Sequence, residues 1–135
     1  MAMERFEELE VWQTARKLAN LIYKLPGGKE WTKDFGLRDQ IRRAAISVMS
    51  NIAGGFEGRT QMMFIEYLGR ARASAGEVRS QLYLARGREY LDESGFGAAI
   101  FLCRSYSRQI GGLVKYLESK PERSLGPHAS PPPRR

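Results

Sequence analysis

The residue types that most often perform chemistry in proteins are sparse in this chain. Its 135 residues include one cysteine, Cys103, and one histidine, His128, so neither an internal disulfide nor a zinc cluster of ordinary spacing can form. No Glu-x-x-His pair is present of the kind with which helical bundles hold two metals. Glu66 and Glu77 lie on roughly one side of a single predicted helix, with no second carboxylate pair to face them. We therefore expect no catalytic residues, no metal site and no cofactor, and hence no enzyme.

The basic side chains are more informative. Of 22 basic residues 16 are arginine, whose planar guanidinium matches phosphate and carboxylate better than the ammonium of lysine does. The net charge of +7 is uneven, because residues 36–89 hold nine basic and five acidic side chains and residues 120–135 hold four and one. An anionic partner such as nucleic acid would explain this excess. The alternative is that the excess merely keeps a helical protein in solution.

Six arginines are the predicted nucleic-acid-binding residues: Arg38, Arg42, Arg43, Arg72, Arg79 and Arg86. The last three recur every seven residues along one predicted helix. Arg86 has Glu89 three positions away, and Arg42 and Arg43 can share Asp39. Arg72 and Arg79 have no carboxylate three or four positions away. Their charge requires carboxylates on another helix, acidic residues of a neighbouring subunit, a nucleic-acid backbone or water.

The same predicted helix carries a second stripe, made of small residues: Gly69, Ala73, Gly76 and Ser80. Glycine inside a helix costs about 1 kcal/mol relative to alanine, so two glycines in this stripe suggest the close approach of another backbone. We interpret the stripe as an oligomer interface. The alternative is that both faces are buried within one bundle, because a middle helix contacts two neighbours.

Four stretches with helical periodicity position these side chains, over residues 9–25, 37–52, 64–85 and 96–117. In the third, the apolar residues alternate steps of four and three, the seam of a bundle or coiled coil. Thr60 is expected to cap this stretch, and Gly54-Gly55 together with Gly58 is expected to end the stretch before it. A polar link through Trp31 and Asp34 joins the first two stretches.

Short connections make neighbouring helices antiparallel, so we predict an all-α, antiparallel up-down-up-down four-helix bundle. The bundle should cover residues 1–119, and a disordered tail with several prolines and arginines should follow over residues 120–135. No apolar run approaches the roughly 20 residues that cross a bilayer, and the acidic first residues do not form a secretory signal. We expect no membrane contact and a cytoplasmic location.

Asn51 is expected to face the core within a polar segment of the second stretch, residues 47–55. A buried amide must find hydrogen-bond partners. We interpret Asn51 as a residue that fixes helix register or caps the next turn, rather than as part of a ligand site.

Several segments of the chain resemble the small four-helix-bundle proteins encoded in intervening sequences of bacterial 23S ribosomal RNA genes. The matching segments are LEVWQTA at 9–15, QIRRAAIS at 40–47, SNIA at 50–53, and Phe64-x-x-Tyr67-Leu68 with residues 71–74 and Glu77. The similarity covers about residues 5–118 and is most specific in the second stretch. One departure is that Gly54 replaces the acid that usually follows Ser-Asn-Ile-Ala in this family.

The resemblance implies a ring-like homopentamer, as in related accessory proteins of diversity-generating retroelements, which bind a reverse transcriptase and nucleic acid. It brings no catalytic residue and no cofactor. Two hypotheses follow. The first is a non-enzymatic oligomer that associates with RNA or DNA through its basic helix faces. The second is a homo-oligomeric protein-interaction scaffold with no direct nucleic-acid binding, in which the arginines make subunit contacts.

Overall fold

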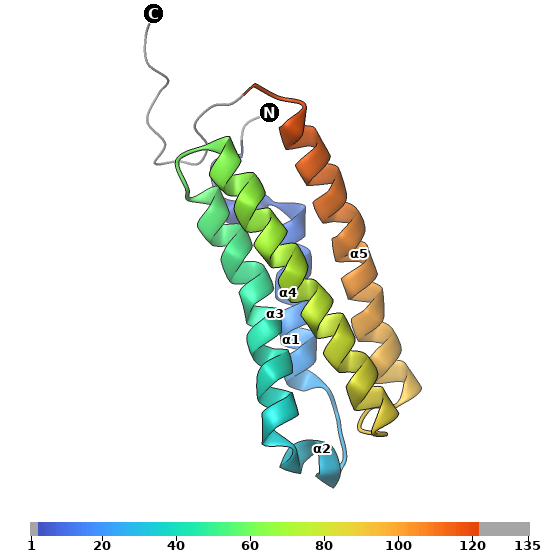
Figure 1. The fold of residues 1–135 in the computed structure, drawn as a ribbon. Helices are drawn as coiled ribbons and strands as arrows, with labels where there is room; N and C mark the ends of the chain where they lie inside the picture. Colours follow the sequence, from blue (N-terminus) through green and yellow to red (C-terminus); the bar gives the residue numbers. More distant parts are fainter. Residues whose placement is uncertain (1–2, 122–135) are drawn as a thin grey trace, which may run out of the picture.

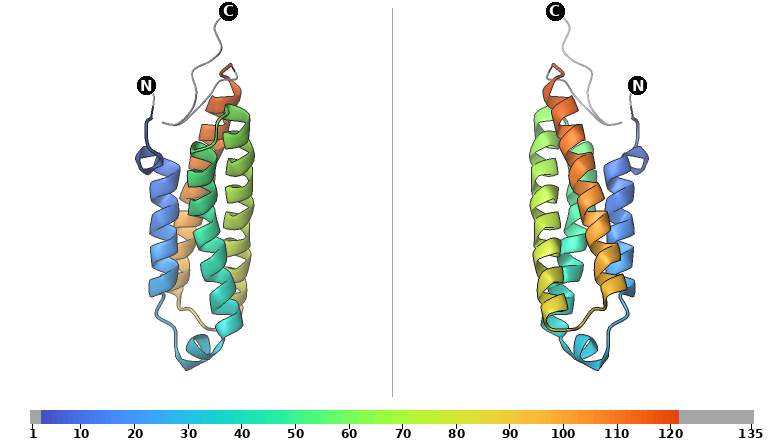
Figure 2. Two further views of the ribbon diagram at one scale, coloured as in Figure 1. Left: turned by 90° about the vertical axis from the view of Figure 1, so that its left-hand side faces the viewer. Right: turned by 90° about the vertical axis from the view of Figure 1, so that its right-hand side faces the viewer.

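A computed structural model describes residues 3–121 as an antiparallel four-helix bundle (Figure 1). The long helices run side by side, with both ends of the described chain at one end of the bundle (Figures 1 and 2). The elements are a 3-10 helix η1 (Phe6–Glu8), α1 (Glu10–Lys24), a short α2 (Lys29–Lys33), α3 (Phe35–Phe56), α4 (Gln61–Gly87) and α5 (Glu93–Glu118). α1 packs against α3 and α5, and α4 packs against the same two helices. The predicted all-α, up-down-up-down bundle is confirmed.

The core forms where the apolar periodicity places it. Every predicted seam position of α4 is buried: Phe64, Leu68, Ala71, Ala75, Val78, Leu82 and Ala85. In α5 the seam is buried as well, apart from Leu113, which is half-buried. Since four helices each bury one apolar stripe, this packing provides most of the stability of the bundle.

The α3–α4 hairpin differs from the prediction at one end. Of the glycines predicted to end α3, Gly54 and Gly55 lie inside the helix, which continues to Phe56, whereas Gly58 lies in the turn that follows it. A Cβ atom on Gly55 would lie 2.6 Å from the Cβ atom of Tyr67, so this glycine permits α3 and α4 to approach closely. The predicted cap at the start of α4 is confirmed, because the Met63 backbone N–H donates to the Thr60 hydroxyl at 3.1 Å.

The prediction of a polar link between the first two long helices is wrong, because the segment contains a short helix and a buried side chain. It contains α2, which crosses the end of the bundle opposite the termini (Figure 1). Trp31 of α2 is buried in the core, with its ring 6.0 Å from that of Tyr90. A single apolar residue in a five-residue helix has no periodicity, so the pattern of the sequence does not reveal it.

Asp34 begins α3 and connects it to the α4–α5 turn. One carboxylate oxygen accepts from the Leu37 backbone N–H at 3.1 Å, and the other accepts from the Tyr90 hydroxyl at 2.9 Å. Arg88 Nε in turn donates to the Tyr90 oxygen at 3.1 Å. The bonds from the Leu37 N–H and the Tyr90 hydroxyl lower the pKa of Asp34, with a smaller contribution from the charge of Arg88.

This carboxylate should make stability depend on acid pH. The pKa of Asp34 is lower in the folded chain than in the unfolded one, so its contribution is present above its ordinary pKa and is lost as pH falls below about 4. Asp34→Asn keeps a capping oxygen but has no charge. In urea melts, wild type should therefore exceed Asp34→Asn in stability at neutral pH, and the difference should shrink below about pH 4. A difference independent of pH would contradict this assignment.

The end of α5 is held by a buried amide. Gln61 Nε2 donates to the carbonyl oxygens of Leu117 at 2.7 Å and Lys120 at 3.0 Å, and so connects the start of α4 to the end of α5. Beyond Lys120 and Pro121, the predicted tail lies outside the described residues. Within residues 3–121, no helix is long and apolar enough to cross a membrane.

Candidate nucleic-acid interface

Arg38 and Arg42 lie on the side of α3 that faces the end of α1. The Arg42 guanidinium lies over the ring of Tyr23, 4.5 Å from its centroid. Arg38 Nη1 donates to the Thr32 carbonyl oxygen at 2.7 Å, and its guanidinium lies 5.8 Å from the centroid of the Phe35 ring. Neither arginine forms an ion pair within residues 3–121. Both charges are therefore held in place by aromatic rings without being neutralised.

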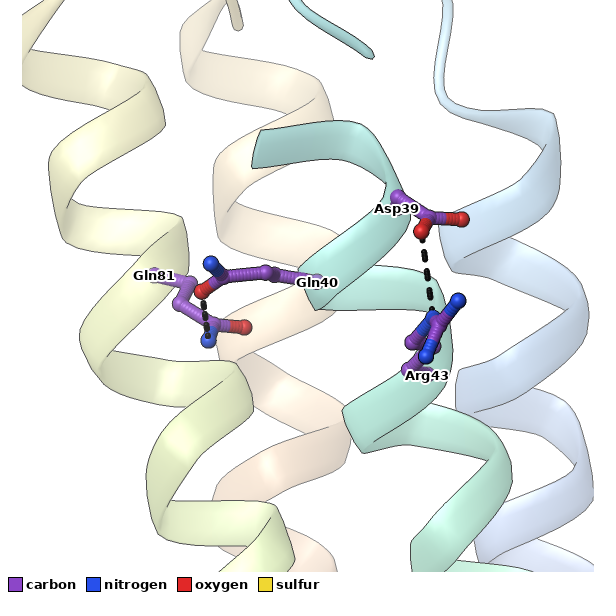
Figure 3. Close-up of polar contacts among 4 residues, drawn as sticks. All are labelled: Asp39, Gln40, Arg43 and Gln81. Carbon is purple, nitrogen blue, oxygen red and sulfur yellow. Dashed lines mark hydrogen bonds and ion pairs between the residues drawn. The ribbon is translucent and has the colours of Figure 1, made fainter. Parts of the chain in front are cut away.

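Arg43, unlike these two, is paired with a carboxylate. Its Nε atom lies 3.1 Å from an Asp39 oxygen, and Figure 3 shows this exposed pair on the side of α3 that is turned away from the α3–α4 contact. Gln81 Nε2 donates to Gln40 Oε1 at 3.3 Å across that contact (Figure 3). The predicted sharing of Asp39 between Arg42 and Arg43 is wrong, because Arg42 contacts Tyr23 instead. An exposed ion pair of this kind contributes little to stability.

Arg72 and Arg79 lie on the side of α4 next to α5, and neither has an ion-pair partner among the described residues. Both side chains are exposed, yet their charges reach buried groups of α5. Burial raises the pKa of the Cys103 thiol to about 11, and the nearby Arg79 opposes this rise. Burial likewise raises the pKa of the Tyr106 phenol, and Arg72 opposes it. The predicted unpaired charge of these two arginines is thus a feature of the folded protomer.

Arg86 is the most constrained of the six. It forms an ion pair with Glu93 at the start of α5, and its guanidinium lies 4.5 Å from the centroid of the Phe96 ring. The sequence suggested Glu89, three residues away, as its neighbour. Glu89 instead has a positive φ of 61° after the end of α4, and the chain turns there. Arg86 therefore offers little free charge to a ligand.

The structure does not gather the predicted residues into one surface. Arg38 and Arg42 belong to the α1–α3 side of the bundle, and Arg72 and Arg79 belong to the α4–α5 side. Arg104 and Arg108 were not predicted, although both are exposed on α5. A signal for them existed, because residues 94–117 contain two arginines, one lysine and no acidic residue.

The stripe of small residues is open in the protomer. Gly69, Ala73, Gly76 and Ser80 are all exposed, and a Cβ atom on either glycine would contact nothing within 4 Å. The alternative that one bundle buries both faces of α4 is therefore wrong for the protomer. Large apolar side chains are exposed on the same helix: Met62, Met63, Tyr83 and Leu84. The oligomer interface itself stays a prediction.

Asn51 has a structural role. Its Nδ2 atom donates to the Ser47 carbonyl oxygen at 2.9 Å and lies 3.0 Å from the Ser47 hydroxyl. That hydroxyl is 2.9 Å from the hydroxyl of Ser74 on α4, so the three side chains join α3 to α4. Asn51 does not cap the next turn. Among residues 3–121, no three His, Cys, Asp or Glu side chains come together as a metal site would require.

Comparison with known proteins decides the family. The model of the 23S rRNA-intervening sequence protein family matches residues 7–112, which is most of the chain. The chain belongs to this family. A solved structure from Bacteroides thetaiotaomicron, a protein of unknown function from the S23 ribosomal protein family, aligns with a TM-score of 0.70 at 20% identity. The alignment covers 78% of this chain and 98% of that one, and at this identity it shows a shared fold.

No curated protein matches the chain significantly. The resemblance on which the sequence analysis relied is confirmed at the level of the family. The relation to retroelement accessory proteins, the pentamer and the reverse-transcriptase partner stay predictions.

Proposed function

We propose that this member of the 23S rRNA-intervening sequence protein family is a non-enzymatic homo-oligomer that associates with RNA or DNA through its exposed arginines. The observation that carries the proposal is the pair Arg72 and Arg79, two exposed guanidinium groups with no ion-pair partner among the described residues. They belong to a chain with a net charge of +7. Phosphates are the ligand that such groups bind best, through charge-assisted and often bidentate hydrogen bonds.

The surroundings of this pair favour a polyanion over a single acidic side chain. Exposed Arg104 and Arg108 extend the positive charge onto α5, which has no acidic residue between Glu93 and Glu118. The contacts would be made to the phosphate backbone, so we expect little sequence preference. A homopentamer, as the family resemblance implies, would repeat the arginines on each subunit and strengthen binding through multivalency. A reverse transcriptase or another RNA-bound protein in the cytoplasm is the kind of partner such an assembly would accompany.

The second candidate is a protein-interaction scaffold, and the open stripe of α4 favours it. Gly69 and Gly76 leave room for another helix backbone, and Met62 and Leu84 on the same helix are exposed apolar groups. In this function Arg72 and Arg79 would contact acids of a neighbouring subunit.

The Arg72→Glu, Arg79→Glu double variant separates the two candidates. If the arginines bind phosphates, affinity for RNA, measured by fluorescence anisotropy at low salt, should fall by at least about tenfold, and the slope of log K against log salt should decrease by about 2. Arg43→Glu with Arg70→Glu is the matched control, since it changes net charge equally but removes arginines that are already paired with Asp39 and Glu66. We expect the control to lose less affinity.

Molar mass in solution, measured by light scattering on the same samples, completes the test. Loss of binding with an intact assembly supports the phosphate surface. Loss of assembly supports the scaffold. Wild-type protein that binds no nucleic acid even at low salt would overturn the proposed function.

A further inference from the structure

A second group of side chains with the chemistry of nucleic-acid binding lies at the end of the bundle where α1 ends and α3 begins. We call it the aromatic–arginine cluster, and it consists of Tyr23, Phe35, Arg38 and Arg42. Each arginine lies over one ring, Arg42 over Tyr23 at 4.5 Å and Arg38 over Phe35 at 5.8 Å from the ring centroid. The Phe35 residue is 72% exposed, the largest exposed fraction among the large hydrophobic residues described. Most of this ring is therefore accessible to a ligand.

The cluster borders an open cavity of about 510 Å³, lined by Phe35, Gly36, Arg38, Asp39 and Arg42. Both arginine side chains are half-buried, and their Nε atoms are covered by protein. The one acid in the lining, Asp39, is already paired with Arg43. The cavity therefore combines the positive charge of two arginines with an exposed aromatic ring.

We infer that this cluster binds single-stranded nucleic acid, with an unpaired base stacked on Phe35 and the adjoining phosphates on Arg38 and Arg42. The inference rests on the proposed function and makes it more specific. Proteins that bind single strands combine arginines along the backbone with aromatic rings on which bases stack, because every base presents a flat face. In a duplex these faces are hidden, so an exposed ring adds nothing to duplex binding. Arginines alone, as on the α4–α5 side, would serve a duplex equally well.

Phe35→Leu tests the ring without changing the charge. The probes are a labelled oligouridylate and an RNA duplex of equal length. The variant should weaken binding of the oligouridylate by about tenfold and leave binding of the duplex unchanged, because stacking on an aromatic ring is lost only for unpaired bases. Phe35→Tyr should restore single-strand binding. Phe101→Leu is the matched control, since Phe101 is 64% exposed on α5 and no arginine of residues 3–121 lies over its ring.

Arg42→Gln tests the phosphate contact separately. It should reduce the salt slope for the oligouridylate by about 0.7, the value expected for one phosphate contact on a single strand. Circular dichroism melts will show that Phe35→Leu and Arg42→Gln remain folded, as expected for substitutions outside the buried core.

The outcomes separate this inference from the proposed function. If wild type binds neither probe, both fail. If wild type binds both probes and Phe35→Leu binds the oligouridylate as tightly as wild type does, the single-strand site alone is overturned. A Phe35→Leu variant that changes molar mass would make the ring a subunit contact, and this too would overturn the inference.

Discussion

Replacing Trp31 with alanine should lower the free energy of unfolding by about 3–5 kcal/mol, the range for a large aromatic side chain removed from a core. Trp31 is 3% exposed and belongs to the same core cluster as residues of α1, α3, α4 and α5. It also packs against Gly27, where an added Cβ atom would lie 2.1 Å from the Trp31 ring. α2 has only five residues, and Trp31 is its buried residue. No other side chain of α2 can therefore fill the cavity that loss of the indole would leave. The measurement is a urea unfolding curve monitored by circular dichroism.

Phe35→Ala is the matched control for this prediction, because Phe35 lies close to Trp31 in the sequence but is exposed. Its effect should stay within about 0.5 kcal/mol, as for most surface substitutions. If Trp31→Ala costs less than about 1 kcal/mol, α2 would be a loosely attached segment and not a closure of the bundle.

The long helices could be predicted because each repeats one apolar stripe over many turns. In α4 all seven predicted seam residues are buried, since a pattern of this length leaves one orientation that buries them together. The burial of Trp31 could not be predicted in this way. Its burial depends on residues of α1, α3, α4 and α5 coming together in one core cluster, and a single residue in a short segment has no repeat that predicts this.

Residue types at the candidate interface could be predicted, but their partners could not. Arg72 and Arg79 have no acid at helical spacing and no ion-pair partner among residues 3–121, so local spacing was sufficient to predict their unpaired charge. Arg86 meets Glu93 because the chain turns back between α4 and α5. Arg42 meets Tyr23 because α1 lies beside α3. Contacts between helices decide which arginines are unpaired, and the spacing of residues within one helix does not predict those contacts.

The glycines of α3 also have a role that depends on contact between helices and that local sequence rules do not predict. By local rules Gly54-Gly55 marks the end of a helix, since glycine is enriched there and weakens a helix interior. The structure instead uses Gly55 inside α3, where Phe64 and Tyr67 of α4 come closest. The close contact between α3 and α4 outweighs this local preference. Substitution of Gly55 can test whether the contact requires a glycine.

Gly55→Ala should destabilise the bundle by about 1–3 kcal/mol, although alanine favours a helix over glycine by about 1 kcal/mol. The new Cβ atom would lie 2.6 Å from Tyr67 Cβ, 3.2 Å from Phe64 Cδ1 and 3.4 Å from the Phe64 carbonyl oxygen. The Cβ atom of Tyr67 is fixed to the α4 backbone, so no side-chain rotation relieves the contact and the two helices must move apart. That movement loosens the packing of Phe56 against Phe64, whose rings are 5.8 Å apart.

Gly97→Ala is the control with the opposite expected sign. Gly97 is exposed within α5 and an added Cβ atom would contact nothing within 4 Å, so alanine should stabilise the protein by about 0.5–1 kcal/mol. Both variants are compared with wild type in the same urea titration. If Gly55→Ala also stabilises the protein, α3 and α4 can separate at little cost and helix propensity alone governs this end of α3. If only Gly97→Ala stabilises it, Gly55, which by local rules predicts a helix end, is instead required for the contact between α3 and α4.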